Sequence, residues 1–179
     1  MSNFQSVVLG GGCFWCTETV FKQLRGVVSV VPGYAGGAKI NPIYEDVCTG
    51  DTGHAEVIKI DFDSEHISFE TLLEVFFSVH NPTTLNAQGH DIGTQYRSVI
   101  FFNNPEQEKI ARAKIAQLTT EEIYADPIVT QIVPLIKFYE AEEYHHDYFA
   151  KNPDQTYCQL VINPKLKKFK EKWMKLIKN

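Results

Sequence analysis

The sequence predicts an α+β fold with a ferredoxin-like, split β-α-β core of two layers, long functional loops and a C-terminal helical extension. Short segments with the apolar alternation of β-strands are separated by segments whose apolar residues recur at helical spacing. Their order over residues 4–102 is β-α-β-β-α-β, which is the order of the split β-α-β arrangement. Two loops rich in glycine and polar residues lengthen the connections, and a lysine-rich amphipathic segment closes the chain.

The first half of the chain is expected to contain three strands and one helix. Residues 4–9 form the first strand, and Val20, Phe21 and Leu24 then recur at helical spacing. A second strand is expected at 27–31 and a third at 55–62. The glycine-rich segment 32–53 between them is predicted to be a long loop, and its aromatic residues and cysteine favour a functional loop.

The second half begins with a helix that Ser68 caps and Asn81-Pro82 ends. A polar loop reaches Thr94, and a strand follows at 96–102. The next helix is expected to have Asn104 as its cap and Pro105 at its first position. The segment 128–138 is rich in β-branched residues, so it predicts further β structure.

The length of 179 residues fits a single catalytic domain. Its core is expected at about 4–138, and residues 139–179 are expected to supply C-terminal helices and a cysteine-bearing loop. The segment 163–179 contains seven lysines and one glutamate, with apolar residues at helical spacing. It therefore predicts an amphipathic terminal helix with a solvated lysine face.

Composition excludes several classes of protein. The 17 basic and 22 acidic residues give a formal charge of −5, which argues against a nucleic-acid binder. The first residues lack the basic and apolar regions of a signal peptide, and no apolar run has transmembrane length. The sequence therefore predicts a cytoplasmic protein without membrane contact, whose four cysteines are reduced or redox-cycling.

The most informative motif is Cys13-Phe14-Trp15-Cys16, which follows three consecutive glycines. Cys13 is expected where a strand turns into a helix, and the unpaired N–H groups there would favour its thiolate. A buried structural thiol has no need for three preceding glycines. Zinc commonly requires two cysteine pairs, or one pair with suitably spaced histidines, and this chain has one CxxC. Cys13 is therefore the candidate nucleophile, and no metal is expected.

Several separate motifs occur in an order that is similar to one family, the A-type peptide methionine sulfoxide reductases. They are Gly12-Cys13-Phe14-Trp15, Tyr44-Glu45-Asp46-Val47-Cys48, Thr52-Gly53-His54-Ala55-Glu56, Gly93-Thr94-Gln95-Tyr96-Arg97-Ser98, and the segments 82–89, 143–148 and 152–158. The resemblance spans almost the whole chain. It implies reduction of the S epimer of methionine sulfoxide, free or in oxidised proteins and peptides, with thioredoxin as reductant and no bound cofactor.

The resemblance also implies roles for individual side chains. Cys13 would attack the sulfoxide sulfur, and Glu56 would act as the acid, because a carboxyl in a partly dry pocket keeps its proton near neutral pH. Tyr44 and Tyr96 would donate hydrogen bonds to the substrate oxygen. Asp91 would help to order the site; its simpler explanation is an Asx-turn.

Phe14 and Trp15 would form the apolar wall around the substrate methyl group, because aromatic rings pair favourably with sulfur and methyl groups. Two aromatic residues at a helix start are also common core residues, so both interpretations stay open here.

A second thiol would convert the Cys13 sulfenic acid into a disulfide. Cys158 matches the family's resolving cysteine, in a loop expected to be mobile. Cys16 departs from the glycine that many members have, and it would share a helix face with Cys13. Cys158 is favoured because strain-free disulfide geometry within one helical turn is difficult. Both assignments stay open.

Two rival functions remain. A general CxxC dithiol-disulfide oxidoreductase would require Cys16, but it leaves Glu56, Tyr44 and Tyr96 without a role. A non-catalytic module would bind zinc through scattered cysteines, or an acidic partner through the lysine-rich helix.

Overall fold

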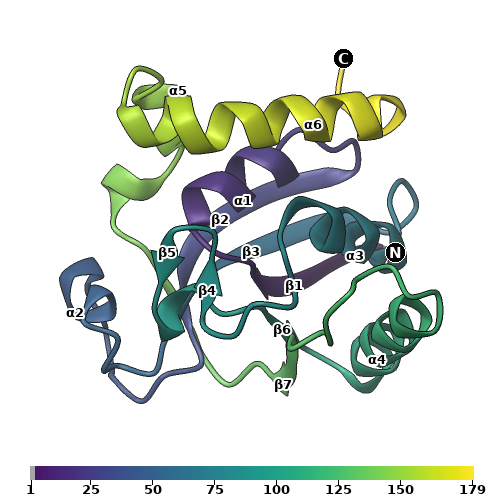
Figure 1. The fold of residues 1–179 in the computed structure, drawn as a ribbon, viewed down its shortest axis with the longest axis horizontal. Coiled ribbons are helices and arrows are strands. Elements are labelled where there is room, and N and C mark those ends of the chain that lie inside the picture. The colour runs from purple at the N-terminus through teal and green to yellow at the C-terminus, as the bar shows by residue number, and fades with distance from the viewer. Residues whose placement is uncertain (1–2) are drawn as a thin grey trace.

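The computed structural model describes residues 3–179, which form a six-stranded sheet with helices packed against it (Figure 1). The strand order is β7-β6-β1-β3-β2-β8, and all neighbours are antiparallel except β6 and β7. The six strands are β1 (Phe4–Gly10), β2 (Val27–Ala35), β3 (Ala55–Asp63), β6 (Val99–Phe102), β7 (Gln131–Pro134) and β8 (Phe138–Glu140). A separate hairpin pairs β4 (Ala87–Gln88) with β5 (Asp91–Ile92).

Six α-helices accompany the strands in the described part of the chain. They are α1 (Phe14–Phe21), α2 (Tyr44–Cys48), α3 (Phe69–Val79), α4 (Pro105–Thr120), α5 (Tyr148–Lys151) and α6 (Asn163–Trp173). Short 3₁₀ turns occupy Thr94–Tyr96, Glu143–His145 and Met174–Leu176, and a π-helical segment occupies Cys158–Ile162. None of these helices is long and apolar enough to cross a membrane.

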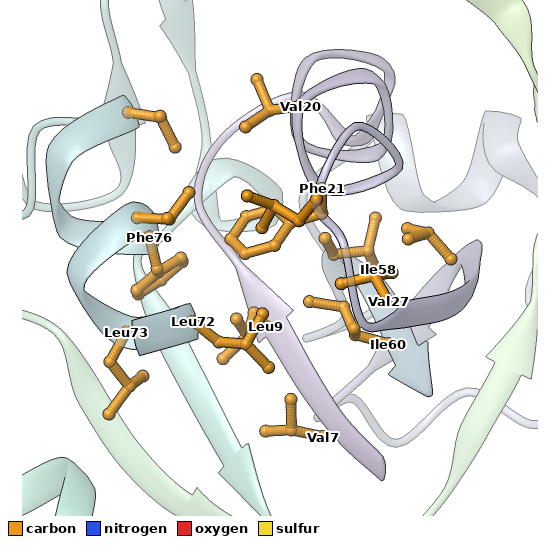
Figure 2. Close-up of a cluster of buried hydrophobic side chains, with 14 of the residues drawn as sticks. Val7, Leu9, Val20, Phe21, Val27, Ile58, Ile60, Leu72, Leu73 and Phe76 are labelled. Carbon is orange, nitrogen blue, oxygen red and sulfur yellow. The ribbon is translucent and has the colours of Figure 1, made fainter. Parts of the chain in front are cut away.

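The main core lies between one face of the sheet and the helices α1 and α3 (Figure 2). Leu9 on β1 pairs in register with Ile58 on β3, and both meet Phe21 of α1 and Phe76 of α3 in this layer. The opposite face carries a smaller cluster around Val57, which residues of the β7–β8 region cover. Most of the buried apolar residues therefore lie on the helix-covered face.

The helix caps agree with the sequence predictions. Ser68 accepts a hydrogen bond from the Thr71 N–H at the start of α3, and Asn104 accepts one from the Gln107 N–H at the start of α4. Each side chain satisfies a donor that the first helical turn leaves unpaired. Pro105 occupies the first turn of α4, as predicted.

Three predictions about element boundaries were wrong. Strand β2 continues to Ala35, because residues 33–35 pair with both β3 and β8, and α2 lies within the segment predicted to be loop. Tyr96 lies in a 3₁₀ turn, and β6 begins only at Val99. Cys158 lies in a π-helical segment that leads directly into α6, rather than in a loop.

The C-terminal helix packs across α1 (Figure 1). Its own residues Leu166 and Phe169 are buried on the face toward the protein, whereas most of its lysines are exposed. This is the predicted amphipathic pattern. A short bridge between Leu24 and Ile177 fastens the end of the chain beside α1. The π-helical segment before α6 lies near the first turn of α1, because Cys158 and Ile162 share a buried cluster with Cys13 and Cys16.

Candidate active site

Cys13 lies where β1 passes into α1, as the sequence predicted. It is the N-cap residue of α1, and its carbonyl oxygen accepts hydrogen bonds from the N–H groups of Cys16 and Thr17. Gly12 has a φ of +93°, and a Cβ there would lie 2.7 Å from the Cγ of Gln88. Only glycine fits this turn without strain, since other residues avoid positive φ and the added atom would collide.

The Cys13 side chain is 8% exposed. Burial raises the pKa of its thiol well above the ordinary value, and interactions with Cys16 and Glu56 raise it further. The expectation that the helix start would favour a thiolate was therefore wrong. Desolvation outweighs the helix terminus here, so Cys13 keeps its proton at neutral pH.

Glu56 lies near the start of β3 and is 2% exposed. Its Oε1 accepts a hydrogen bond of 3.3 Å from the Phe14 N–H, in the first turn of α1. Burial raises the pKa of this carboxyl to about 8, with Asp91 and Cys16 adding to the rise and the Phe14 hydrogen bond opposing it. Glu56 is therefore protonated at neutral pH and able to donate its proton.

Two phenols lie close enough to Glu56 for its charge to change their pKa values. Tyr44 begins α2, and Tyr96 ends the 3₁₀ turn before β6; both are half-buried. Burial, and then the proximity of Glu56, raises the pKa of both phenols. Asp91 and Cys13 raise the pKa of Tyr96 further. Both hydroxyls therefore stay protonated and can serve as hydrogen-bond donors.

Phe14 and Trp15 differ in their surroundings. Phe14 is 1% exposed and packs in the main core, with its ring centroid 5.7 Å from that of Tyr34 and 6.4 Å from that of Tyr44. Trp15 is half-buried, and its ring stacks on Tyr148 at 3.7 Å with an interplanar angle of 6°. Phe14 is thus both a core residue and a wall of this site, while Trp15 is available at its edge.

Asp91 accepts a 2.6 Å hydrogen bond from the Tyr157 hydroxyl. The same hydroxyl lies 3.9 Å from the Sγ of Cys16, and the Tyr157 ring meets the Trp15 ring edge-on. Asp91 therefore joins the β4–β5 hairpin to the segment that carries Cys158. The resemblance implied an ordering role for Asp91, and Tyr157 is the partner that it did not name.

Three thiols gather in one buried cluster: Cys13 and Cys16 from the start of α1, and Cys158 from the π-helical segment. All are free, and Cys158 is fully buried. Cys48 is exposed at the end of α2 and lies outside this cluster. Over residues 3–179, no three side chains of His, Cys, Asp or Glu gather in a way that could hold a metal ion.

Sequence reasoning missed four residues that touch the site. Tyr157 bonds to Asp91, Tyr34 packs on Phe14, His145 accepts a hydrogen bond from Trp15, and Glu142 accepts one from the Tyr44 N–H. Tyr157 could have been found from its position next to Cys158. His145 lies in the segment 143–148 that carries the resemblance, but no role was assigned to it. Glu142 carried no signal, and the contacts of both link segments more than 90 residues apart.

A groove with a volume of about 920 Å³ lies away from Cys13. It runs between the end of α3 and α6, and its walls include Leu160, Val161 and Lys165, just beyond Cys158. The chemistry is therefore assigned from the cluster of reactive groups, not from cavity size.

A buried thiol beside a protonated carboxyl, two phenol donors and further thiols define a thiol-dependent oxidoreductase. A sequence model of the family "Peptide methionine sulfoxide reductase" matches residues 5–177. The peptide methionine sulfoxide reductase MsrA of Polynucleobacter asymbioticus is 55% identical over 177 residues, which cover 99% of this chain and 93% of that one. The chain belongs to the peptide methionine sulfoxide reductase family.

Solved structures agree. The methionine sulfoxide reductase A of Corynebacterium diphtheriae has a TM-score of 0.81 at 34% identity, covering 86% of this chain and 77% of that one. Mxr1 from Saccharomyces cerevisiae in complex with Trx2 has a TM-score of 0.56 at 25% identity, covering 82% of this chain and 85% of that one. The rival interpretation as a general dithiol-disulfide oxidoreductase is therefore not favoured.

Proposed function

We propose that this chain reduces the S epimer of methionine sulfoxide, in proteins and as the free amino acid, with Cys13 as nucleophile and Glu56 as acid. The observation that carries this proposal is the Glu56 carboxyl, which is 2% exposed, has a pKa of about 8 and bonds to the N–H of the residue after Cys13. A neutral carboxylic acid next to a thiol suits a substrate whose oxygen needs a proton before its bond to sulfur breaks.

In the first step the Cys13 sulfur attacks the sulfoxide sulfur while Glu56 protonates the oxygen. The S–O bond of the substrate then breaks, and the hydroxyl is transferred to Cys13 as a sulfenic acid. Methionine leaves with the electron pair. Glu56 regains a proton from the Cys13 thiol, so one thiol and one sulfoxide give one sulfenic acid and one sulfide.

The side chains around Cys13 are proposed to hold the substrate. Tyr44 and Tyr96 donate hydrogen bonds to the sulfoxide oxygen, because burial keeps both phenols protonated. Phe14 and Trp15 contact the substrate methyl group, since aromatic rings interact favourably with sulfur and its substituents. Asp91 orders the site through its hydrogen bond from Tyr157.

A second thiol then attacks the sulfenic sulfur, releasing water and forming a disulfide. We assign this step to Cys158, with Cys16 as the alternative, because both belong to the buried cluster around Cys13. A dithiol of the thioredoxin class then reduces the disulfide, in keeping with the Trx2 complex of the yeast relative. The reaction balances with thiols as its only reductant, so it uses no metal or organic cofactor.

Three features of the whole chain complete the proposal: its fold type, its domain extent and its location. The inner strands run β6-β1-β3-β2 with antiparallel neighbours, which supports a ferredoxin-like core extended by β7 and β8. The packing of α6 on α1 supports one catalytic domain over residues 1–179. The four free thiols and the use of a thiol reductant support a cytoplasmic location.

The proposal is tested by single-turnover stoichiometry without added reductant. The reduced protein mixed with methionine sulfoxide should release about one methionine per chain and lose two titratable thiols. Cys13→Ser should release none. Cys48→Ser changes a thiol outside the cluster and keeps a hydroxyl for the hydrogen bond with Tyr44, so it should still release about one methionine per chain and lose two thiols. Release of methionine by Cys13→Ser would remove Cys13 from the reaction.

A further inference from the structure

The segment of residues 141–148, here called the brace, connects β8 to α5 and lies against the candidate active site. At its start the Ala141 N–H donates to the Pro32 carbonyl of β2. Near its end the Asp147 N–H donates to Glu18 Oε1 on α1, at 3.1 Å. The brace is thus fastened at both ends to the two elements beside the site, and the proposed reaction gives its side chains no role.

His145, at the centre of the brace, holds Trp15. The Trp15 indole N–H donates to His145 Nδ1 at 3.0 Å, and His145 is fully buried. Because Nδ1 accepts, the neutral ring carries its proton on Nε2. Burial lowers the pKa of His145, which keeps the ring in this neutral form. Tyr148 stacks on the indole at 3.7 Å, so the brace fixes Trp15 by its face and by its N–H.

The Nε2 donor of His145 has no partner among the described residues. A buried unpaired donor costs about 1–3 kcal/mol, a cost that an apolar ring at this position would avoid. Among the described residues, the imidazole makes one hydrogen bond: its Nδ1 accepts from the Trp15 indole N–H. A histidine at this position is therefore explained by its hydrogen bond with Trp15, which orients the indole ring.

Glu142 holds the main chain of Tyr44. Its Oε2 accepts a 2.9 Å hydrogen bond from the Tyr44 N–H, and its Oε1 accepts a 3.0 Å bond from the Tyr34 hydroxyl. Partial burial raises the pKa of Glu142, but these two hydrogen bonds, together with its own N–H and His145, lower it more, so the carboxylate is ionised. The His145 ring also lies edge-on to the Tyr44 ring at 4.4 Å, so one segment contacts both side chains.

We propose that His145 and Glu142 are positioning residues, which set Trp15 and Tyr44 at the distance that a bound methionine sulfoxide requires. The brace thereby couples the apolar wall of the pocket, Trp15, to the polar wall, Tyr44. Neither positioning residue touches the reacting atoms. The inference rests on the proposed function, because it takes Trp15 and Tyr44 as substrate contacts.

The first test is a double-mutant cycle between positions 145 and 15. His145→Phe keeps a ring but removes the acceptor, and it should raise KM for methionine sulfoxide about tenfold, as expected for the loss of one buried hydrogen bond. His145→Asn, which keeps an acceptor oxygen near Nδ1, should restore part of the loss. In a Trp15→Phe background, which has no indole N–H, His145→Phe should have little further effect.

The matched control is His146→Phe, the same substitution one residue along, where the ring bonds to the Ala141 carbonyl and not to the site. Equal effects of His145→Phe in the wild-type and Trp15→Phe backgrounds would overturn the role of His145. A lower kcat with unchanged KM would also overturn it, because a merely structural change lowers the active fraction. If Trp15→Phe itself leaves KM unchanged, the substrate role of Trp15 fails instead, which separates the two claims.

A spectroscopic measurement keeps the inference testable if His145→Phe folds poorly. The chain has two tryptophans, so its ¹H–¹⁵N spectrum should show two indole signals, and Trp173→Phe assigns them. The Trp15 indole proton should exchange slowly in the wild type and in His146→Phe, and at an intermediate rate in His145→Asn, whose shorter side chain keeps a weaker acceptor. An unprotected Trp15 indole in the wild type would contradict the hydrogen bond.

The second test addresses Glu142. Glu142→Ala removes both acceptors and should raise KM severalfold, whereas Glu142→Gln keeps a carbonyl acceptor for the Tyr44 N–H and should recover part of the affinity. Glu143→Ala is the matched control, since the Glu143 side chain is 89% exposed. Equal KM values for Glu142→Ala and Glu143→Ala would exclude Glu142 as a positioning residue.

Discussion

At the scale of single residues, the proposed role of Glu56 as the acid depends on where β3 places its side chain. Glu56 pairs in register with Tyr34 of β2, on a part of the sheet that is covered on both faces. Burial is the main reason that its pKa reaches about 8. An ordinary glutamate is ionised at neutral pH and could not supply a proton, so the depth of burial is part of the proposed chemistry.

This yields a prediction about pH. The wild-type rate of methionine formation in a single turnover should fall as the pH rises through about 8, because Glu56 is then losing its proton. Below that pH, Glu56→Gln should be slower by about 10²- to 10⁴-fold, which is the usual contribution of a general acid to the rate. Its rate should also lack the decrease near pH 8. Glu70→Gln, an exposed glutamate on α3, is the control. A Glu56→Gln profile with the wild-type shape would assign that proton to another group.

At the scale of elements, α1 and the π-helical segment bring three thiols together, and their roles can be separated. Cys158→Ser should still release about one methionine per chain rapidly, but thioredoxin-driven cycling should stall. Cys16→Ser should cycle, if Cys158 resolves the sulfenic acid. Assays of single turnover and of steady state decide between them, and a stall confined to Cys16→Ser would exchange the two roles.

The turn into α1 makes a prediction about stability. Gly12→Ala should lower the free energy of unfolding by about 2–4 kcal/mol, because a positive φ costs about 1 kcal/mol and the collision with Gln88 adds the cost of overpacking. Gly89→Ala is the matched control: its φ is +58°, but an added Cβ meets nothing within 4 Å. Denaturant unfolding measures both. Equal losses would show that Gln88 does not constrain the turn.

Elements with a local signal were predicted well from the sequence. The caps at Ser68 and Asn104, the strand at β1 and the helix after the glycines follow from short-range patterns, and all are present. The end of β2 and the start of β6 were misplaced because long-range pairing fixes them. Cys158 was expected in a loop because Asn152-Pro153 suggests a break, yet its own segment is helical and packs on α1.

At the scale of the whole molecule, the candidate site is assembled from segments that lie far apart in the sequence. β1, β3, the β4–β5 hairpin and the segment after β8 each contribute, and the core between the sheet and α1 holds them in place (Figure 1). Motifs could therefore predict which residues gather at the candidate site, but not their contacts. The hydrogen bonds of His145 with Trp15 and of Tyr157 with Asp91 depend on tertiary packing, and only the structure reveals them.

The central claim is the reduction of one epimer of methionine sulfoxide by Cys13. It is tested most directly by supplying the separated S and R epimers of a blocked methionine sulfoxide to the protein with dithiothreitol, beside Cys13→Ser. The account predicts consumption of the S epimer alone by the wild type and of neither by the variant. Consumption of neither epimer by folded, reduced wild-type protein would contradict it, as would undiminished activity of Cys13→Ser.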